Sequence, residues 1–540
     1  MLFVDLAIGE LRETLRRRYR MPQLTLNGSG RKPSTTEAQM NAEKTTRLVR
    51  SICAAICMVV SAGFIPAVEQ SKPISIHPQN PHYFLFRGKA IVLITSGEHY
   101  GAVFNGDFDD HRYLETIERD GLNFTRIFGG EYVEVPGKSF GIQRNDLAPG
   151  SGKFIAPWAR SQAPGYAGGG NKFDLEQWNP EYFRRFHDFL AEAGKRGIVV
   201  EVTLFSAHYD VAQWNLSAFN PANNVNRTTA IDWKDLHTAA NGNISSFQDR
   251  YARKLVSEAN GYDNVIFEIQ NEPWSDRPVF FGVINPYLFP PNRNRFPNSI
   301  DLPDDRAMLW QQHIVSIIVD QERSMPNHHL ISQNYANFRF PVREVIPAVS
   351  ILSFHYAYPE AATWNYGLGI PISCDETGFL GHEDDAYRRQ AWNFMLSGGA
   401  VFDGLDYSFN VGNEDGLDTA PNGPGGGSRD LRRQLRVLLT FLNSLPLADL
   451  HPDASVVQHA GGTIPRVLAS PGREYAIYLD GDGPVDVTLD IAPGNYEETW
   501  IDVKTGSSAR SARVWHAGGT LVLHSPAFQD GIALRLQRKP

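Results

Sequence analysis

Short apolar segments recur along the middle of this chain, and polar residues end each of them. Amphipathic segments with helical spacing lie between them, at 113–117, 183–193, 246–258, 310–318, 387–396 and 431–445. Strands that alternate with helices indicate an α/β fold with a parallel sheet. Eight such strands predict a (β/α)8 TIM barrel with loop insertions at its catalytic face. The expected strands are 91–94, 123–128, 198–205, 265–269, 330–332, 349–354, 370–374 and 400–407.

A doubly wound parallel sheet is the alternative arrangement of the same elements. Dinucleotide-binding sheets of that kind carry a Gly-x-Gly-x-x-Gly turn after their first strand. No such turn follows any of the expected strands. We therefore favour the barrel.

The residue pattern changes near residue 447. From 456 onward, apolar and polar residues alternate, as in 475–479, 485–491, 500–503, 521–523 and 532–536. This period-two pattern predicts a small antiparallel β-sandwich. We assign 69–447 to the barrel and 448–540 to the C-terminal β-sandwich domain, which we expect to support the barrel. The segment Asp480-Gly481-Asp482-Gly483 is expected to form a hairpin turn, with a calcium-binding loop as the alternative.

The first 68 residues resemble a targeting segment. Three basic residues follow Met40 closely, and 51–68 carries no charge. A basic region, a short apolar region and small residues are typical of a secretory signal peptide. We expect 1–68 to be an upstream extension and signal peptide, with translation starting at Met40 and the product secreted or periplasmic. An uncleaved anchor is the alternative, but the segment is short for a membrane span. After cleavage we expect no stable membrane insertion.

Charge and cysteine content exclude several classes of protein. The formal net charge is −9, which argues against nucleic acid as a partner. Only Cys374 lies outside the N-terminal segment, so neither a disulfide framework nor a cysteine-based metal site is expected in 69–540. A single cysteine in an apolar strand is typical of buried packing, with a nucleophile as the alternative. We expect no cofactor and no metal, and the sequence leaves the oligomeric state open.

Two of the expected strands end in carboxylates. The strand 265–269 runs into Asn271, Glu272 and Pro273, and the strand 370–374 runs into Asp375 and Glu376. The carboxyl ends of barrel strands form the catalytic face. Hydrolysis of a glycosidic bond needs two carboxyl groups, because one protonates the leaving oxygen while the other attacks or activates water.

Of the two neighbouring acids, Glu376 is the expected nucleophile. Successive strand residues face opposite sides of a sheet. If Glu376 faces the barrel mouth, Asp375 is therefore expected to face the surrounding helices or a rim partner.

These residues resemble the clan A retaining glycoside hydrolases, which include the family 5 cellulases and mannanases. The resemblance covers 84–445 and rests on Asn271-Glu272-Pro273 at the fourth strand and Glu376 at the seventh. It implies a β-glycoside hydrolase that cleaves a polysaccharide or oligosaccharide by double displacement. Glu272 would be the acid/base, Glu376 the nucleophile, and Asn271 the partner of the sugar 2-hydroxyl.

The same resemblance suggests further substrate-binding residues. Arg126 on the second strand would steady the nucleophile, and His355 would match a histidine on the sixth. His355 is followed by Tyr356-Ala357-Tyr358, whereas the family has His-x-Tyr, so the tyrosine partner of the nucleophile is left open. We select Tyr356. The eighth strand ends in Asp406-Tyr407-Ser408-Phe409 rather than tryptophan, so the sugar platform differs. Other strand exits expected to contact sugar carry Glu98, His99, His208 and Trp274.

Two alternative functions remain. One is a catalytically inactive carbohydrate-binding protein on the same barrel, against which both glutamates and Asn271 argue. The other is a metal-dependent barrel using His208 and His355, but no His-x-His follows the first strand. Sugar identity, linkage and endo or exo action are not predicted.

Overall fold

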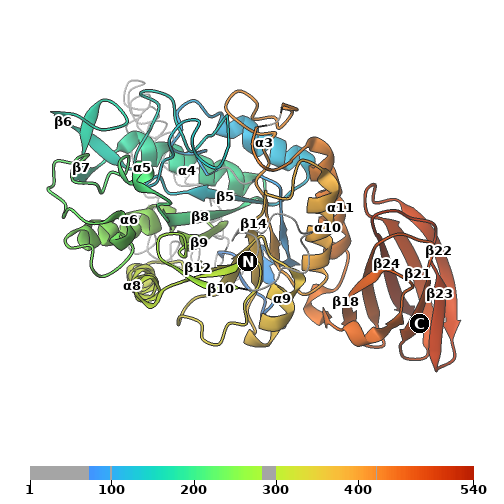
Figure 1. The fold of residues 1–540 in the computed structure, drawn as a ribbon. Coiled ribbons are helices and arrows are strands. Elements are labelled where there is room, and N and C mark those ends of the chain that lie inside the picture. The colour runs from blue at the N-terminus through green and yellow to red at the C-terminus, as the bar shows by residue number, and fades with distance from the viewer. Residues whose placement is uncertain (1–71, 98–99, 283–298, 421) are drawn as a thin grey trace, which may run out of the picture. The chain divides into compact units, whose positions relative to one another are not determined.

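The computed structural model describes residues 72–97, 100–282, 299–420 and 422–540. Eight parallel strands form its central sheet, in the order β4-β15-β14-β13-β12-β9-β8-β5 (Figure 1). Since β5 to β15 follow one another in chain order and β15 pairs with the first strand, β4, this nearly closed sheet confirms the predicted TIM barrel. The strands are β4 (Leu93–Ile94), β5 (Phe124–Phe128), β8 (Val199–Ser206), β9 (Val265–Asn271), β12 (Leu330–Asn337), β13 (Ile351–His355), β14 (Ile372–Glu376) and β15 (Val401–Phe402).

One asparagine joins the first and last strands of this order. The Asn123 side chain accepts from Ile94 N at 2.9 Å and donates to Val92 O at 2.8 Å. Its side-chain amide thus takes the place of a backbone peptide between β4 and β5. One backbone hydrogen bond also crosses between the two strands, from Asn123 N to Ile94 O at 3.5 Å.

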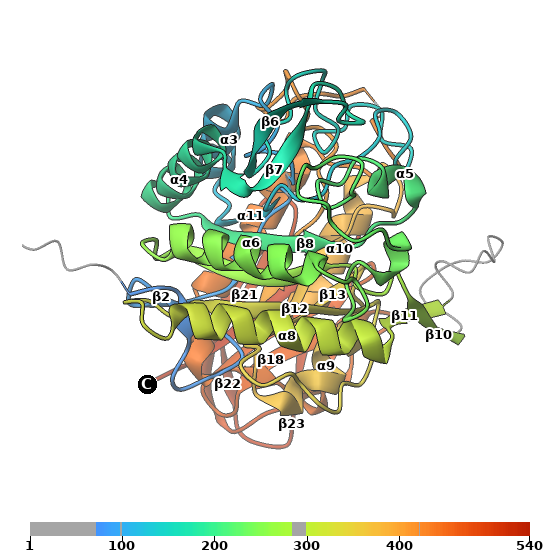
Figure 2. The same ribbon diagram turned by 90° about the vertical axis from the view of Figure 1, so that its left-hand side faces the viewer.

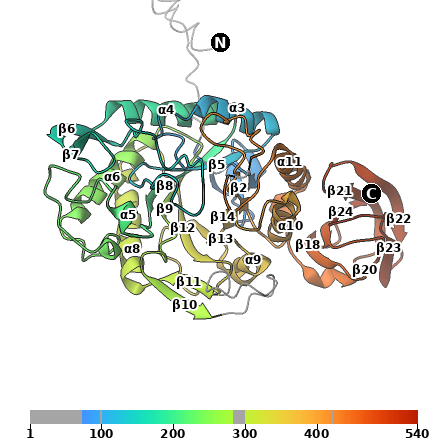
Figure 3. The same cartoon turned by 45° about the horizontal axis from the view of Figure 1, so that its top comes forward.

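Helices surround the strands, as Figure 3 shows. Their buried faces carry the apolar residues of the predicted periodicity, and local signals set their ends. Before α4, Asn179 caps the backbone of Glu181, and Pro180 is the first helical residue. The helices are α3 (Asp110–Asp120), α4 (Pro180–Lys195), α5 (Val211–Trp214), α6 (Ile244–Ala259), α8 (Asp305–Glu322), α9 (Pro359–Asn365), α10 (Asp384–Met395) and α11 (Arg429–Asn443); α6 and α8 lie side by side in Figure 2.

Short sheets extend the barrel. The antiparallel strands β1 (Ser75–Ile76), β2 (Phe84–Phe86) and β3 (Lys89–Ile91) precede β4, so the first expected strand begins later than predicted. Two hairpins lie in loop insertions, one formed by β6 (Trp158–Pro164) and β7 (Asn171–Trp178), the other by β10 (Pro278–Gly282) and β11 (Ser299–Pro303). The eighth strand is shorter than expected, because residues 403–407 leave the sheet as a loop.

The C-terminal region is the predicted β-sandwich. Its larger sheet holds β16 (His451–Pro452), β18 (Ile464–Ser470), β19 (Glu474–Asp480), β24 (Ile532–Lys539), β21 (Gly494–Asp502) and β22 (Ser508–His516). The smaller sheet holds β17 (Val457–His459), β20 (Asp486–Asp490) and β23 (Thr520–His524). Alternate residues of both sheets, including Ile477, Leu489 and Trp500, fill the space between them.

The expected hairpin at 480–483 is wrong. β19 and β20 belong to different sheets, so this segment crosses the sandwich and does not reverse a strand. Asp480 is engaged elsewhere, because it accepts from Arg389 at 2.7 Å and from Asn393 at 2.9 Å, both on α10. The residues next to Asp480 in the sequence do not predict these partners, which lie in a distant part of the chain.

The larger sheet packs against the barrel helices. Trp392 of α10 stacks on Tyr478 of β19 with ring centroids 5.3 Å apart. Both residues belong to the hydrophobic core that also fills the barrel. A shared core means that neither part can be removed without exposing apolar surface.

Several predictions lie outside the described residues. They concern the extension and signal peptide at 1–68, and the site residues Glu98 and His99. The domain limits 69–447 and 448–540 also stay predictions. Among the described residues, no helix has both the length and the apolar character needed to cross a lipid bilayer.

Candidate active site

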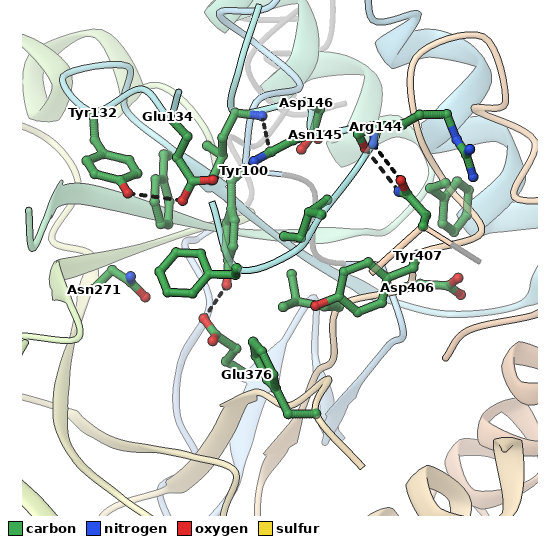
Figure 4. A pocket seen from close by; sticks show the side chains of 18 of the residues that line it. Tyr100, Tyr132, Glu134, Arg144, Asn145, Asp146, Asn271, Glu376, Asp406 and Tyr407 are labelled. Carbon is green, nitrogen blue, oxygen red and sulfur yellow. Dashed lines mark hydrogen bonds between the residues drawn. The ribbon is translucent and has the colours of Figure 1, made fainter. Parts of the chain in front are cut away.

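A pocket opens at the carboxyl ends of the barrel strands. Figure 4 shows Glu376 at the strand side of this pocket, with side chains from three rim loops around it. Both predicted catalytic glutamates and Asn271 line the pocket. Its other lining residues include Tyr100, Phe128, Tyr132, Glu134, Phe140, Arg144, Asn145, Asp146, Tyr209, Tyr356, Phe379, Asp406, Tyr407, Phe409 and Asn422.

Tyr356 and His355 bridge the two glutamates. The Tyr356 hydroxyl donates to Glu376 Oε1 at 2.6 Å and lies 3.2 Å from Glu272 Oε1. His355 Nδ1 lies 3.0 Å from Glu272 Oε1 and 3.5 Å from Glu376 Oε2. An oxygen of each carboxyl and a nitrogen of His355 all lie within 4.8 Å of one another. The two acids therefore form one site, although they come from separate strands.

Glu272 has an unusual backbone conformation. Its φ is 44°, and that of Tyr356 is 53°; a non-glycine residue in this region costs about 1–3 kcal/mol. Neighbouring groups hold Glu272 there, because its N–H donates to Asn334 at 2.8 Å and its carbonyl accepts from Ser275 N at 2.8 Å. The turn aims the side chain into the pocket, where Tyr209 donates to Glu272 Oε2 at 2.8 Å.

Arg126 lies fully buried beneath the pocket. Its guanidinium forms a bidentate ion pair with Glu268, with Nε 2.9 Å from Oε2 and Nη2 2.9 Å from Oε1. Nη2 also donates to Asn271 Oδ1 at 2.8 Å, and Nη1 donates to the Tyr100 hydroxyl at 2.9 Å. Nη1 lies 3.4 Å from Glu376 Oε2, an oxygen that also accepts from Tyr100. Arg126 thus links Asn271, Glu376 and Tyr100.

Opposite charges set the ionisation of Glu376. Burial alone would raise the pKa of Glu376, but the charge and hydrogen bond of His355, then Arg126 and Tyr100, lower this pKa to about 2. Burial likewise disfavours the His355 cation, yet Glu376, Glu272 and Asp375 raise the pKa of His355 well above 6.5. The arrangement therefore stabilises an ionised Glu376 beside a protonated His355.

Of the two environments expected for Asp375, the structure shows polar partners, His355 and Arg126, and not the surrounding helices. Asp375 is buried with one carboxylate oxygen 3.6 Å from His355 Nε2 and the other 3.9 Å from Arg126 Nε. The pairing of β13 with β14 shifts register between Ser353 and His355. This bulge breaks the strict alternation of side chains, so that Asp375 and Glu376 both face the barrel interior.

The structure separates the predicted binding residues that it describes into three groups. Asn271 and Tyr356 line the pocket, whereas Arg126 and His355 lie directly behind it. His208 and Trp274 are buried and are not among the described residues that line the pocket. Trp274 packs edge-on against His355, with centroids 5.5 Å apart, and His208 N donates to Asp276 at 2.7 Å. Their contact with sugar stays a prediction.

Sequence reasoning missed several polar residues of the site. Tyr100 and Tyr209 bind the two glutamates, and Glu268 fixes Arg126. Glu268 lies four residues before Glu272 within an apolar strand, and a charged residue there was a usable signal. Glu134 and Asn145 belong to an insertion whose sequence carries no strand or helix pattern, so no comparable signal marked them.

Within the part of the chain that the structure describes, two groups of side chains have the spacing of a metal site, Glu272-His355-Glu376 and Glu268-His355-Asp375. Both include His355. A histidine ligand must be neutral to bind a metal, whereas the surrounding carboxylates raise the pKa of His355. Glu268 is already paired with Arg126. These carboxylates therefore fit a network of ion pairs with His355 and Arg126 better than a metal site.

Comparison with solved structures identifies relatives of this fold. A glycoside hydrolase family 5 protein from Bacteroides vulgatus is 12% identical, with a TM-score of 0.54 over 86% of this chain and 93% of that one. The fold is that of known glycoside hydrolases. A second Bacteroides vulgatus structure, described as a candidate glycoside hydrolase, is also 12% identical, with a TM-score of 0.57 over 87% of this chain and 83% of that one. A third glycoside hydrolase is 12% identical, with a TM-score of 0.53 over 86% and 97%. No protein-family model and no curated protein matches this sequence.

Proposed function

We propose that this protein is a retaining β-glycoside hydrolase that acts by double displacement, with Glu272 as acid/base and Glu376 as nucleophile. The observation that carries the proposal is the pairing of these two carboxyls in one pocket, joined through Tyr356 and His355. The shared fold of solved glycoside hydrolases supports it.

The first step uses the ionised Glu376. Its carboxylate attacks the anomeric carbon, while Glu272 gives its proton to the glycosidic oxygen of the departing group. Tyr356 and Tyr100 donate to different oxygens of Glu376. These donors hold the carboxylate in one orientation, so little reorganisation is needed for attack.

The second step releases the sugar. Glu272, now a carboxylate, takes a proton from water as the water oxygen attacks the anomeric carbon. The ester bond to Glu376 breaks, and the carboxylate returns to its starting state. Tyr209 and His355 lie at hydrogen-bond distance from the two oxygens of Glu272 and keep it directed at the reacting bond.

Retention of configuration is supported by the separation of the acids. Retaining enzymes hold their carboxyl groups about 5 Å apart, while inverting enzymes leave roughly 6.5–9.5 Å for a water molecule. One oxygen of Glu272 and one of Glu376 lie within 4.8 Å. That spacing is close to the separation in retaining enzymes and fits direct attack by Glu376.

The substrate class follows from the pocket surface. It combines aromatic rings such as Phe140, Phe379 and Tyr407 with polar groups such as Asn271 and Asp406. Sugar rings have apolar faces and hydroxyl edges, so this mixture suits a polysaccharide or oligosaccharide. We further propose secretion or periplasmic export, on the basis of the basic and apolar pattern before residue 68.

A substrate screen tests the proposal directly. The purified protein is incubated with a panel of aryl β-glycosides and polysaccharides, in parallel with Glu376→Gln. We expect hydrolysis by the native protein and its loss in the variant. Binding to the same glycans without any hydrolysis would favour the alternative of a non-catalytic carbohydrate-binding protein.

A further inference from the structure

Two rim insertions join on one side of the pocket. One connects β5 to β6, and the other connects β15 to α11. The Asn422 side chain pairs with both backbone polar groups of Arg144, accepting from N at 2.6 Å and donating to O at 3.0 Å. Gln143 N donates to Asn422 O at 2.7 Å, and Arg144 forms an ion pair with Asp418 at 2.6 Å. Asn422 is 2% exposed, so water cannot readily replace these bonds.

This junction encloses the β4 side of the barrel mouth. β4 pairs with β15, and Asn123 connects it to β5 on its other side. The insertions therefore leave the barrel on either side of β4 and meet beyond its end. Figure 4 shows Arg144, Asn145 and Tyr407 around the pocket, across from Glu376. The side chains of the two insertions that line the pocket include Phe140, Arg144, Leu147, Tyr407, Phe409 and Asn422.

The catalytic residues fix the direction of the substrate. The two carboxyls flank the bond that breaks, so a sugar chain passes between Glu272 and Glu376. These residues follow β9 and end β14, and only β12 and β13 separate the two strands on one side of the barrel. One end of the chain thus points toward β12 and β13, and the other toward β4, where the insertions join.

The order of the chemical steps decides which half of the substrate, the leaving group or the sugar that becomes bonded to Glu376, lies on the enclosed side. The leaving group departs while the other half remains bonded to Glu376. A leaving group bound on the side that the joined insertions enclose could not diffuse out, because the sugar esterified to Glu376 would block its way to solvent. The leaving group therefore extends toward β12 and β13, and the sugar that becomes esterified occupies the enclosed side.

Glu134 is a carboxylate available at the enclosed side. It lines the pocket at 4% exposure. Oε1 accepts from the Tyr132 hydroxyl at 3.0 Å, and Oε2 accepts from Asn145 Nδ2. Burial raises the pKa of Glu134 to about 7, and its hydrogen bonds to Asn145 and Tyr132 oppose this rise. In its ionised form a carboxylate accepts about four hydrogen bonds, so capacity remains for sugar hydroxyls. Hydrogen bonds from the hydroxyls of a bound sugar would also replace part of the hydration that the Glu134 carboxylate loses on burial.

We propose that the enzyme is exo-acting: it removes the terminal sugar from the non-reducing end, and Glu134 recognises the hydroxyls of that sugar. This inference rests on the proposed glycosidase function. It adds that the substrate is bound at a chain end, and that Glu134 recognises the terminal sugar.

The product pattern of the native enzyme tests exo action. Oligosaccharides prepared from the polysaccharide that the screen identifies are labelled at the reducing end with an aromatic amine. We expect the first products to be a free monosaccharide and a labelled chain one unit shorter. Labelled products of all lengths at the earliest times would overturn exo action but leave the glycosidase intact. Failure to hydrolyse any glycoside would overturn both.

Variants test the role of Glu134. Glu134→Gln keeps the shape of the side chain but removes its charge, so KM for the aryl monosaccharide substrate should rise about tenfold or more, with a smaller change in kcat. Lys138→Ala, an exposed change in the same insertion, is the control and should leave KM unchanged. Equal KM values for Glu134→Gln and the native enzyme would contradict recognition by Glu134. The melting temperature of each variant checks that it is folded.

Discussion

His355 Nδ1 lies 3.5 Å from Glu376 Oε2 at the base of the pocket. Burial disfavours the charged form of each residue when that residue is alone. In the pair, each residue stabilises the charged form of the other and so offsets the effect of burial on its pKa. The proposed nucleophile is consequently ionised, at the cost of a protonated histidine inside the barrel. This relationship predicts how stability and activity change with pH.

The first prediction concerns stability at alkaline pH. The folded-state pKa of His355 is raised above 6.5, so its stabilising contribution is complete below pH 6.5 and is lost as pH rises through the raised value. Relative to His355→Gln, the native protein should show its largest advantage in melting temperature at or below pH 6.5. That advantage should shrink at higher pH. A difference that stays constant from pH 6 to 10 would contradict the assignment.

The second prediction concerns the acid side. The pKa of Glu376 falls from 4.5 to about 2, so its contribution to stability is present above pH 4.5 and is lost as pH falls toward 2. Glu376 should therefore remain ionised throughout the acid limb of the kcat/KM profile. Because the Glu376→Gln variant lacks this group, its melting temperature should fall less steeply than that of the native protein between pH 4.5 and 2.

The third prediction identifies the nucleophile. A 2-fluoro glycoside with a good leaving group should inactivate the enzyme and label the peptide that contains Glu376, as determined by mass spectrometry. Glu376→Ala should lower kcat on the order of 10⁴-fold or more. NMR of the first product should show retained configuration. Label on Asp375 would move the nucleophile by one residue, and an inverted product would remove the covalent step.

The fourth prediction tests the acid/base. Glu272→Ala should slow substrates with poor leaving groups by about 10²–10⁴-fold. Activated aryl glycosides need less proton donation, so their glycosylation step should be affected much less. Azide should restore turnover of these substrates by replacing the missing base in the second step. Equal losses on both substrate types, without azide rescue, would argue against this role.

The fifth prediction separates the β-sandwich from catalysis. Tyr478→Ala removes the ring that stacks on Trp392 and should lower the free energy of unfolding by about 3 kcal/mol. KM for aryl glycosides should stay the same, because neither residue lines the pocket. Trp515→Ala is the control, since this side chain is 67% exposed and its loss should cost less than about 0.5 kcal/mol.

Removing 456–540 altogether should harm stability more than sugar affinity. The truncated chain would expose the apolar faces of α10 and α11 that now pack against the larger sheet. Thermal unfolding and polysaccharide binding measure the two effects. Normal melting combined with weak binding would instead assign sugar recognition to the sandwich.

Much of the barrel was predictable because its signals are local. A short apolar run followed by polar residues indicates a buried parallel strand, and the helix pattern between runs indicates its connection. Asn271, Glu272 and Glu376 end such runs, so the sequence predicted that they meet at one rim. The lengths of the strands and their order along the chain were enough for this prediction, since the parallel strands of a barrel all end on the same face.

Other features depend on residues distant in the chain. The direction of Asp375 depends on a bulge opposite β13, and the path of 481–485 depends on which sheet accepts β20. Tyr100, Glu268 and Asn422 acquire their roles only from partners that folding brings near. The sequence by itself determined the order of strands and helices and the acids at the strand ends. Tertiary structure alone decided strand register, the closure of the rim and the hydrogen bonds around each acid, because those depend on packing between segments that no local pattern connects.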